Sequence, residues 1–484
     1  MSCDELQPII GLEIHCQLRT ESRLFSPGPV DSGASPNSRL TAYDIALPGS
    51  LPVVNRRAVD MAIGAGLALD CTIHSRSRFD RKHYFYPDLP RGYQITQYDR
   101  PLCSGGELVF DVDGAQKSLA LTGIHLEEDA GKSIHDDDHQ RTLIDYNRAG
   151  TPLIEIVTDP DLRSPTEAEA ALRALHRLVV HLGICDGNLE DGSFRCDANI
   201  SLRGPDGQRG GRTELKNLNS FRFVRRALSA EIRRRRQQVS DPGSSGDETR
   251  LYDPDHDSTR PMRSKETSPD YRFVPDPDLP ELTVDYDQIQ RVRDELPESP
   301  RRRRRRFIDG LGLSVDNAER MVDPPARADF FERAVQSNAG APAPSIANFI
   351  ANDVLSYVTT DIGALDISPE DVADIVALVE DSTISTSAAS TVLDELIDGD
   401  ETPRQVVERL ELRQLDNDDQ IETIVDQVLR DNPQLVADYR QGKTKLFGHF
   451  MGQVMKASSG RADPEKASAK LRDKLSSPTT TETP

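Results

Sequence analysis

The chain has 484 residues and a formal net charge of −22. This length is sufficient for roughly two to four domains with separate cores. The sequence contains no apolar run near the roughly 18 residues of a membrane helix, and its acidic N-terminus resembles neither a signal peptide nor a transit peptide. These properties argue against the classes of membrane and secreted proteins and predict a cytoplasmic protein.

The acidity is spread along the chain and is accompanied by a strong preference for Arg over Lys, which suggests a halophile with a high-salt cytoplasm. In such salt the Debye length falls to about 3 Å, so an acidic surface does not repel a polyanion as it does in dilute buffer. Net charge therefore does not exclude a nucleic-acid partner. Six cysteines form no CxxC pair, which predicts reduced core residues instead of a disulfide framework, a redox motif or a zinc knuckle.

The predicted fold class is α+β. Short alternating runs rich in Gly and Pro predict a first domain over residues 1–292 with an antiparallel sheet and one clear helix, over Pro165 to Leu182. Helical periods then predict an all-α domain over 293–400 and a small helical tail domain over 401–476. The Ser/Thr/Pro-rich end, 477–484, is expected to be disordered.

The first strand carries candidate ligands on one face. Strict alternation puts Glu13, His15 and Gln17 on the opposite side from Leu12 and Ile14. A Glu and a His two residues apart on a strand can hold a divalent cation, and they also occur on solvated sheet faces. The strand alone leaves both interpretations open.

Carboxylates recur later in the chain. Glu127, Glu128 and Asp129 follow one another directly, and such a cluster repels itself unless a cation lies among the carboxylates. The oxygen-rich set formed with Glu155, Asp197 and Glu214 suits magnesium, although separate surface acids remain the alternative in so acidic a protein.

Glu155 lies within an apolar strand, Leu153 to Val157, where a carboxylate needs a cation, a metal or a hydrogen-bond donor. This indicates either a structural ion pair or an active site. For Asp145 and Arg148, just before that strand, a mutual ion pair is the alternative to a role in the site.

Cations alternate with aromatic residues over Asp80 to Pro87 and over Asp270 to Phe273, a pattern that binds phosphates and stacks bases but also occurs where strands reach the surface. No Walker loop is present, so ATP would bind without a P-loop. Two arginine runs, over 233–236 and 301–306, predict solvated helix faces, with contact to tRNA phosphates as the alternative.

Taken in order, several motifs resemble those of the B subunits of aspartyl/glutamyl-tRNA(Asn/Gln) amidotransferases, the GatB/GatE family. They are IGLEIH, DRKHYFYPDLPRGYQITQ, HLEEDAGK, DYNRAGTPLIEIV, GSFRCDANISL, TELKNLNSFRFV and DYRFVPDPDL. The C-terminal stretch GKTKLFGHFMGQVMKASSGRADPEKASAKL resembles the tail domain of the same family. The middle helical domain matches more loosely.

The resemblance implies a ligase that forms a carbon–nitrogen bond with glutamine as amido donor. ATP phosphorylates the side-chain carboxylate of Asp or Glu esterified to tRNA(Asn) or tRNA(Gln), and ammonia then displaces the phosphate. The ammonia comes from a separate amidase, the A chain of a heterotrimer whose third member is a small C chain. A non-catalytic tRNA-binding adaptor of the same complex is the alternative. A further alternative is the paralogous protein specialised for Glu-tRNA. The short span between Asp276 and Arg301 leaves no room for the insertion that this paralogue usually carries.

The resemblance also implies roles for individual residues in a catalytic cradle. Magnesium ligands and catalytic groups are expected among Glu13, His15, Glu127 or Glu128, and Glu155, with Asp197 and Glu214 at a neighbouring cation or ATP site. Charge and motif membership favour phosphate contacts by Lys82, Arg148, Arg195 and Lys216. In the tail, the lysines expected near the tRNA backbone are Lys443, Lys445, Lys456 and Lys470.

One loop departs from the family. Some members carry a four-cysteine zinc knuckle after the first strand, whereas residues 25–28 and 40–44 contain no cysteine. No zinc is therefore expected, and the loop is predicted to hold its shape through Pro and Gly turns or by docking on a partner.

Overall fold

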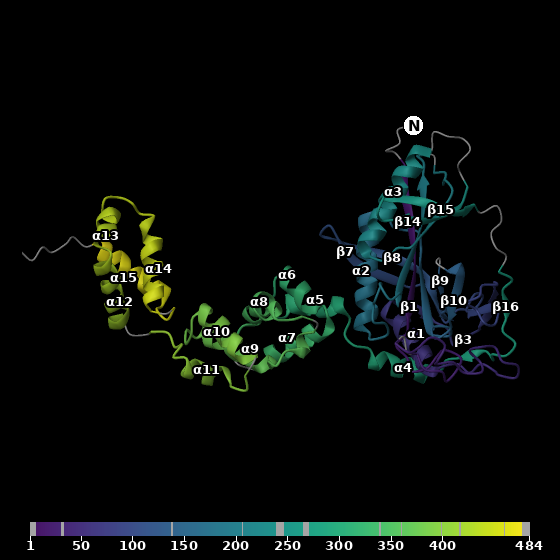
Figure 1. Ribbon diagram of the computed structural model, residues 1–484, viewed down its shortest axis with the longest axis horizontal. Helices are drawn as coiled ribbons and strands as arrows, with labels where there is room; N and C mark the ends of the chain where they lie inside the picture. The colour runs from purple at the N-terminus through teal and green to yellow at the C-terminus, as the bar shows by residue number, and fades with distance from the viewer. Residues whose placement is uncertain are drawn as a thin grey trace, which may run out of the picture. The chain divides into compact units, whose positions relative to one another are not determined.

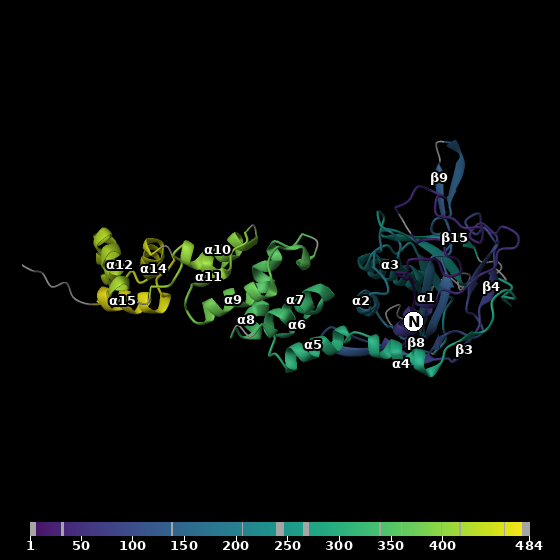
Figure 2. The same cartoon turned by 90° about the horizontal axis from the view of Figure 1, so that it is seen from below.

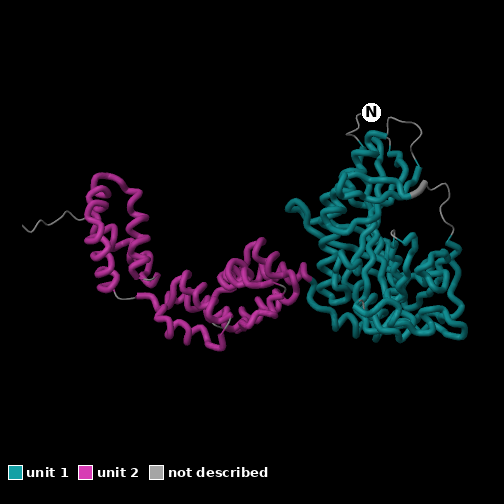
Figure 3. Tube along the Cα trace, in the orientation of Figure 1, with its two compact units in different colours: residues 1–299 teal, residues 300–484 magenta. Residues whose placement is uncertain are grey.

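The computed structural model describes residues 6–30, 33–136, 139–205, 207–238, 246–264, 271–337, 340–359, 361–397, 399–415, 418–458 and 460–476. The predicted disordered end, 477–484, lies outside these residues. The chain divides into two compact units, residues 1–299 and 300–484 (Figure 3). In the part of the chain that the structure describes, no helix is both long and apolar enough to cross a lipid bilayer.

A ten-stranded sheet is the frame of the first unit, with strand order β15-β14-β13-β12-β1-β11-β8-β6-β2 and β7 paired to β8. The strands are β1 (Gln7–Gln17), β2 (Thr72–Ile73), β6 (Cys103–Ser104), β7 (Glu107–Val112), β8 (Ala115–Glu128), β11 (Pro152–Thr158), β12 (Phe194–Arg203), β13 (Thr213–Lys216), β14 (Glu248–Asp253) and β15 (Ser258–Ser264). The α+β class is confirmed, but the sheet is mixed because β13 and β14 run parallel.

Smaller sheets lie outside this frame. They are formed by β16 (Val274–Pro275), β4 (Asp80–His83) and β5 (Tyr93–Thr96), by β9 (Lys132–Asp136) with β10 (Arg141–Asp145), and by β3 (Arg76–Ser77) with β17 (Leu282–Thr283). The β9–β10 hairpin projects from the first unit (Figure 2). The segment before Glu155 is thus split between two sheets, since β10 ends at Asp145 and β11 begins at Pro152.

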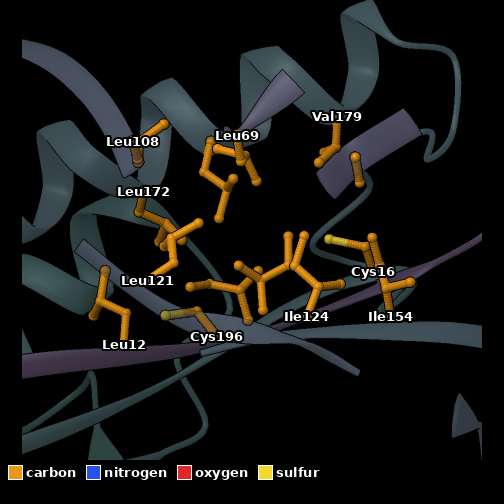
Figure 4. Close-up of a cluster of buried hydrophobic side chains, with 14 of the residues drawn as sticks. Leu12, Cys16, Leu69, Leu108, Leu121, Ile124, Ile154, Leu172, Val179 and Cys196 are labelled. Carbon is orange, nitrogen blue, oxygen red and sulfur yellow. The ribbon is translucent and has the colours of Figure 1, made fainter. Parts of the chain in front are cut away.

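The two faces of the large sheet differ in character because side chains alternate along its strands. Cys16 of β1 lies beside Ile154 of β11, and with Leu12 they belong to an apolar cluster that Leu172 and Val179 of the helix α2 cover (Figure 4). The helices of the first unit are α1 (Arg56–Ala68), α2 (Pro165–His181), α3 (Phe221–Gln238) and α4 (Tyr286–Glu295) (Figure 1). The opposite face carries polar residues such as His15, Glu127 and Glu155.

The predicted helix over Pro165 to Leu182 is confirmed as α2, and the helix expected at the arginine run 233–236 is the end of α3, whereas α1, α4 and the start of α3 were not anticipated. Residues 62–66 of α1 are alanine and glycine except for Ile63, and these small residues obscure the helical period. Their size has a packing reason, because a Cβ on Gly66 would lie 2.7 Å from Cys103 Sγ and 2.7 Å from Ile73 Cδ1. The five described cysteines, including Cys103, are buried and free, as expected.

The second unit is helical: α5 (Pro300–Asp309), α6 (Val315–Val322), α7 (Pro325–Gln336), α8 (Ala343–Asn352), α9 (Pro369–Glu380), α10 (Thr386–Ile397), α11 (Pro403–Arg409), α12 (Asp418–Asp431), α13 (Pro433–Arg440), α14 (Leu446–Ala457) and α15 (Pro464–Ser476), with two short 3-10 turns, Val354–Ser356 and Ile362–Ala364. Val406 and Val407 of α11 pack in the same apolar cluster as Phe307. A separate cluster begins at Ile421. The hydrophobic core of the tail thus starts later than the expected boundary at residue 401.

Neither arginine run forms a fully solvated helix face, so that expectation is wrong for part of each run. Arg235 of α3 is largely buried and bonds Thr213 and the fully buried Glu231. Arg303 of α5 is also buried and donates to Asp329 and Glu332. A buried guanidinium needs such partners to offset its desolvation, and these arginines therefore hold elements together.

Candidate functional site

Four charged or titratable side chains form a row across the polar face of the large sheet. His125 of β8 is opposite Glu155 of β11, which is opposite His15 of β1. His15 is in turn opposite Arg195 of β12. Residues directly opposite each other on antiparallel strands point to the same face and lie within contact distance. The central position of β1 therefore brings together residues that are far apart in the sequence.

A compact group of ligand atoms surrounds His15. Its Nε2 lies 3.5 Å from Glu127 Oε1, 3.8 Å from Glu13 Oε1 and 3.8 Å from Glu155 Oε1. One ligand atom from each of Glu13, His15 and Glu155 lies within 4.8 Å of the other two. The three side chains are only partly covered. This arrangement can hold a metal ion that keeps open positions toward the solvent.

The protonation of this group follows from its crowding. Burial, the charge of Glu155 and a hydrogen bond with it raise the pKa of Glu13 to about 8. Burial works against ionisation of Glu155 too, but hydrogen bonds with His125 and Glu13 lower its pKa to about 2. Two carboxyl groups that share a site cannot easily both ionise. Without a cation, the pair therefore holds one proton, on Glu13.

His15 is neutral at neutral pH. Burial lowers its pKa, with the charge of Arg195 acting in the same direction and the charge of Glu155 opposing it. A neutral imidazole retains a lone pair for a metal ion. The neutral state of His15 is therefore the one that the predicted role as a metal ligand requires.

Glu127 and Glu128 point in opposite directions because they are neighbours on β8. Glu127 faces His15, and burial followed by the charge of Glu155 raises its pKa well above the usual range. Glu128 instead accepts hydrogen bonds from Ile95 N at 3.0 Å and from the Arg91 guanidinium. The structure thus puts Glu127 in the group and leaves Glu128, expected as a catalytic residue, outside it.

Asp197, Glu214 and Lys216 pair with one another. Lys216 Nζ lies 2.8 Å from Asp197 Oδ2 and 3.1 Å from Glu214 Oε1, and these charges raise the pKa of Lys216 although burial opposes them. An ammonium group occupies the space between the two carboxylates that were expected to bind a second cation. Lys216, which was expected to contact phosphate, contacts these two carboxylates in the structure.

Arg148 and Arg195 both approach Asp129. Arg195 Nη2 lies 3.1 Å from Asp129 Oδ1, and Arg148 Nε lies 3.7 Å from Asp129 Oδ2. The alternative of an Asp145–Arg148 pair is wrong, because Asp145 Oδ1 accepts hydrogen bonds from the backbone N–H groups of Asn37 and Asn147. Sequence reasoning noted Asp129 only as a member of an acidic run. The sequence feature that could have singled out Asp129 is its position directly after the last residue of β8, Glu128.

Lys82 lies on β4, outside the row, with its Nζ 4.9 Å from the Tyr271 ring centroid. It belongs to a strip of surface aromatics in which Tyr98 and Phe273 are stacked with their centroids 4.0 Å apart. Lys82 also lies near enough to Glu127 to oppose the rise in its pKa. The cation–aromatic pattern thus lies beside the polar face.

The loop after β1 is held by Arg23, a residue that sequence reasoning missed. Its side chain is completely buried, lies 3.5 Å from Asp44 Oδ2, and donates to the backbone carbonyl groups of Arg39, Asn147 and Ala149. One guanidinium group therefore joins the loop without cysteines to the turn that carries Arg148. Arg23 is thus an internal support of this loop that the expectation of Pro and Gly turns did not include.

The tail lysines differ in their surroundings. Lys443 pairs with Asp438 at 2.9 Å, and Lys470 pairs with Glu422 at 2.8 Å. Lys445 and Lys456 are exposed at the two ends of α14, and neither forms an ion pair with another described residue. These two are the tail lysines best able to bind an external anion.

Comparison with known proteins gives a consistent result along the chain. Residues 8–290 match the family model of the GatB/GatE catalytic domain, and residues 329–475 match that of the GatB domain. The chain is 49% identical to the B subunit of aspartyl/glutamyl-tRNA(Asn/Gln) amidotransferase from Halorhodospira halophila, over 97% of this chain and 99% of that protein. It is 47% identical to the protein of the same name from Alkalilimnicola ehrlichii, over 98% and 100% of the two chains. For the protein from Geobacter sulfurreducens the identity is 46%, over 97% and 99%.

Proposed function

The chain belongs to the family of aspartyl/glutamyl-tRNA(Asn/Gln) amidotransferase B subunits, and from this membership we propose that it carries the ATP-dependent step of amidation. Its substrates are Asp-tRNA(Asn), Glu-tRNA(Gln) or both, and its products are the corresponding Asn-tRNA and Gln-tRNA. Its partners are an amidase, the A chain, which releases ammonia from glutamine, and a small C chain. The single observation that carries this proposal is the convergence of Glu13, His15, Glu127 and Glu155 on the polar sheet face.

The proposed reaction has two steps. An oxygen of the esterified amino acid's side-chain carboxylate attacks the γ-phosphorus of ATP, the bond to the bridging oxygen breaks, and ADP leaves. Ammonia then attacks the acyl carbon, the carbon–oxygen bond to phosphate breaks, and a proton is released. Both phosphoryl donor and acceptor are anions, so positioning and charge neutralisation are the main requirements. No protein nucleophile is needed.

Magnesium fits the group around His15, since three carboxylates and a neutral imidazole offer mainly hard ligand atoms with open positions. When bound, the ion would neutralise phosphate charge. Glu13, His15 and Glu155 would hold it, with Glu127 beside them. Arg148 and Arg195 would bind phosphate oxygens from the neighbouring edge.

Reconstitution tests the function directly. The complex of this chain with its amidase and small partners is incubated with ATP, glutamine and each mischarged tRNA, and amidated product is measured separately for Asp and Glu. We expect ATP-dependent product from at least one tRNA. Its absence with both tRNAs, in a complex that hydrolyses glutamine, would refute the proposal.

Magnesium binding is expected to depend on pH. Since Glu13 has a pKa raised to about 8, it is mostly protonated at pH 7 and must release its proton to the buffer when a cation binds. Affinity should therefore rise by up to about tenfold per pH unit toward pH 8 and level off above it. Calorimetry in two buffers of different ionisation enthalpy measures the released proton. Glu13→Gln should bind more weakly and depend less on pH, and equal affinity at pH 6 and pH 8 in the wild-type protein would contradict the assignment.

The tail is proposed to bind the tRNA body through Lys445 and Lys456. Replacing both with Ala should weaken tRNA binding and reduce the slope of log affinity against log salt by about one to two units. Lys443→Ala is the matched control, because Lys443 is already paired with Asp438. Removal of residues 418–484 should have a larger effect while sparing assembly with the amidase, and it leaves Val406 and Val407 in their cluster. Unchanged tRNA affinity in both variants would exclude this role.

A further inference from the structure

Asp129 is a buried carboxylate at the edge of the polar face, with 5% of its surface exposed. Its side chain accepts hydrogen bonds from Gln17 Nε2 at 2.6 Å and from Arg195 Nη2 at 3.1 Å. Its backbone is fixed too, because its N–H donates to Thr151 O at 2.9 Å and its carbonyl accepts from Gly150 N at 2.9 Å. The carboxylate is thus held in place from β1, β12 and the turn before β11.

The two arginines beside Asp129 come from different elements and remain accessible. Arg195 of β12 is directly opposite His15, and Arg148 lies in the turn between β10 and β11. Each side chain is 34% exposed. Arg148 is further oriented by the carbonyl groups of Ala130 at 3.0 Å and Gly131 at 2.7 Å. One side of each guanidinium group is therefore held by protein contacts, and another side is accessible to solvent.

The charge balance around Asp129 is positive. Two guanidinium groups share one carboxylate, and neither forms an ion pair with any other acid among the described residues. The Lys216 cluster has the opposite balance, with one ammonium group and two carboxylates. The excess positive charge around Asp129 thus lies beside the carboxylates that surround His15. Such a juxtaposition suits a ligand that carries both an anion and a bound cation.

We propose that Asp129 is a positioning residue for the phosphates of ATP, acting through Arg148 and Arg195. This inference rests on the proposed function of the site. The carboxylate fixes one edge of each planar guanidinium group, and the remaining N–H groups bind phosphate oxygens. A guanidinium group matches phosphate through paired hydrogen bonds, so its orientation matters as well as its charge.

Asp129→Asn in the reconstituted complex tests the inference. The KM for ATP should rise about tenfold, since a misplaced positioning group weakens productive binding, while the KM for mischarged tRNA and the Mg²⁺ affinity stay unchanged. Asp136→Asn is the matched control, because Asp136 also pairs with an arginine, Arg141, but on the β9–β10 hairpin. It should leave all three values unchanged. An unchanged KM for ATP in Asp129→Asn would overturn the inference.

Arg195→Lys provides a second variant. It keeps the positive charge at residue 195 and the negative charge of Asp129, and it tests the inference even if the Asp129→Asn protein does not fold. It should raise the KM for ATP to a similar extent. Adding Asp129→Asn should then raise the KM by less than it does in the wild-type complex, because only the effect through Arg148 remains. Effects that multiply fully would indicate a separate structural role and would overturn the inference, as would an unchanged KM in Arg195→Lys.

Direct ATP binding to the same complexes, in the presence of Mg²⁺, keeps the two hypotheses apart. A wild-type complex that binds ATP about tenfold more tightly than the Asp129→Asn complex but forms no amidated tRNA would contradict only the proposed function. Equal ATP binding by the two complexes, with amidation intact in the wild type, would contradict only the positioning role.

Discussion

Replacement of Glu155 by Ala is expected to lower ATP-dependent amidation by about a hundredfold or more. Loss of an outer-shell partner of a metal ligand alone costs 10- to 100-fold, and Glu155 contributes directly to the group around His15. The variant also removes the charge that keeps the proton on Glu13. Amidated tRNA formed by the reconstituted complex at saturating ATP is the measurement.

Two variants make this result specific. Glu155→Gln preserves the size of the side chain and should be nearly as inactive, because an amide is a poor substitute for a charged ligand. Glu190→Ala, which alters an exposed acid in a turn, should retain full activity. The alternative of a non-catalytic adaptor makes the opposite forecast: full transamidation by Glu155→Ala, in a complex that still binds tRNA, would favour the adaptor.

Replacement of Arg23 by Met is expected to destabilise the first unit by about 3–5 kcal/mol, the range seen when one partner of a buried ion pair is removed. The substitution leaves Asp44 without its buried cation, and four backbone carbonyl groups, those of Arg39, Tyr146, Asn147 and Ala149, lose their donor. Calorimetric unfolding of the full chain can follow the transition of the first unit separately from that of the helical unit.

Arg76→Met is the corresponding control. Arg76 pairs with Glu281, but its side chain is 72% exposed, and exposed pairs contribute about 0–1 kcal/mol. Similar losses in the two variants would mean that the Arg23 network contributes no more than a surface pair. A loss of stability in Arg23→Met alone would identify Arg23 as an internal support of the loop that has no cysteines.

Local sequence patterns predicted the parts of the site that lie within one strand. Alternation in β1 placed Glu13 and His15 on one face, and Glu155 was correctly assigned to a strand with an apolar face. The pattern could not show that β12 pairs with β1, which sets Arg195 opposite His15. Strand order depends on pairing between residues far apart in the sequence, and the local periodicity of the sequence does not reveal it. The choice between Glu127 and Glu128 likewise depended on the register of β8.

Charges were the least predictable feature, because a charged residue's partner is fixed only by the tertiary fold. Lys216 was expected to contact phosphate, and it lies between two acids. Arg235 and Arg303 were expected on solvated faces, and both are buried in ion-pair networks. The helix α1 was hidden for a different reason, since close packing at Gly66 demands small residues that weaken the helical pattern.

The central position of β1 also has a consequence for biosynthesis. β1 leaves the ribosome before both of its neighbours, β11 and β12, and the latter ends only at Arg203. Until that residue has been translated, one edge of β1 remains unpaired, and an unpaired apolar strand is prone to association with other chains. β1 can therefore pair along both edges only after much of the first unit has been translated, and nascent chains that stall before β12 are the ones expected to need a chaperone.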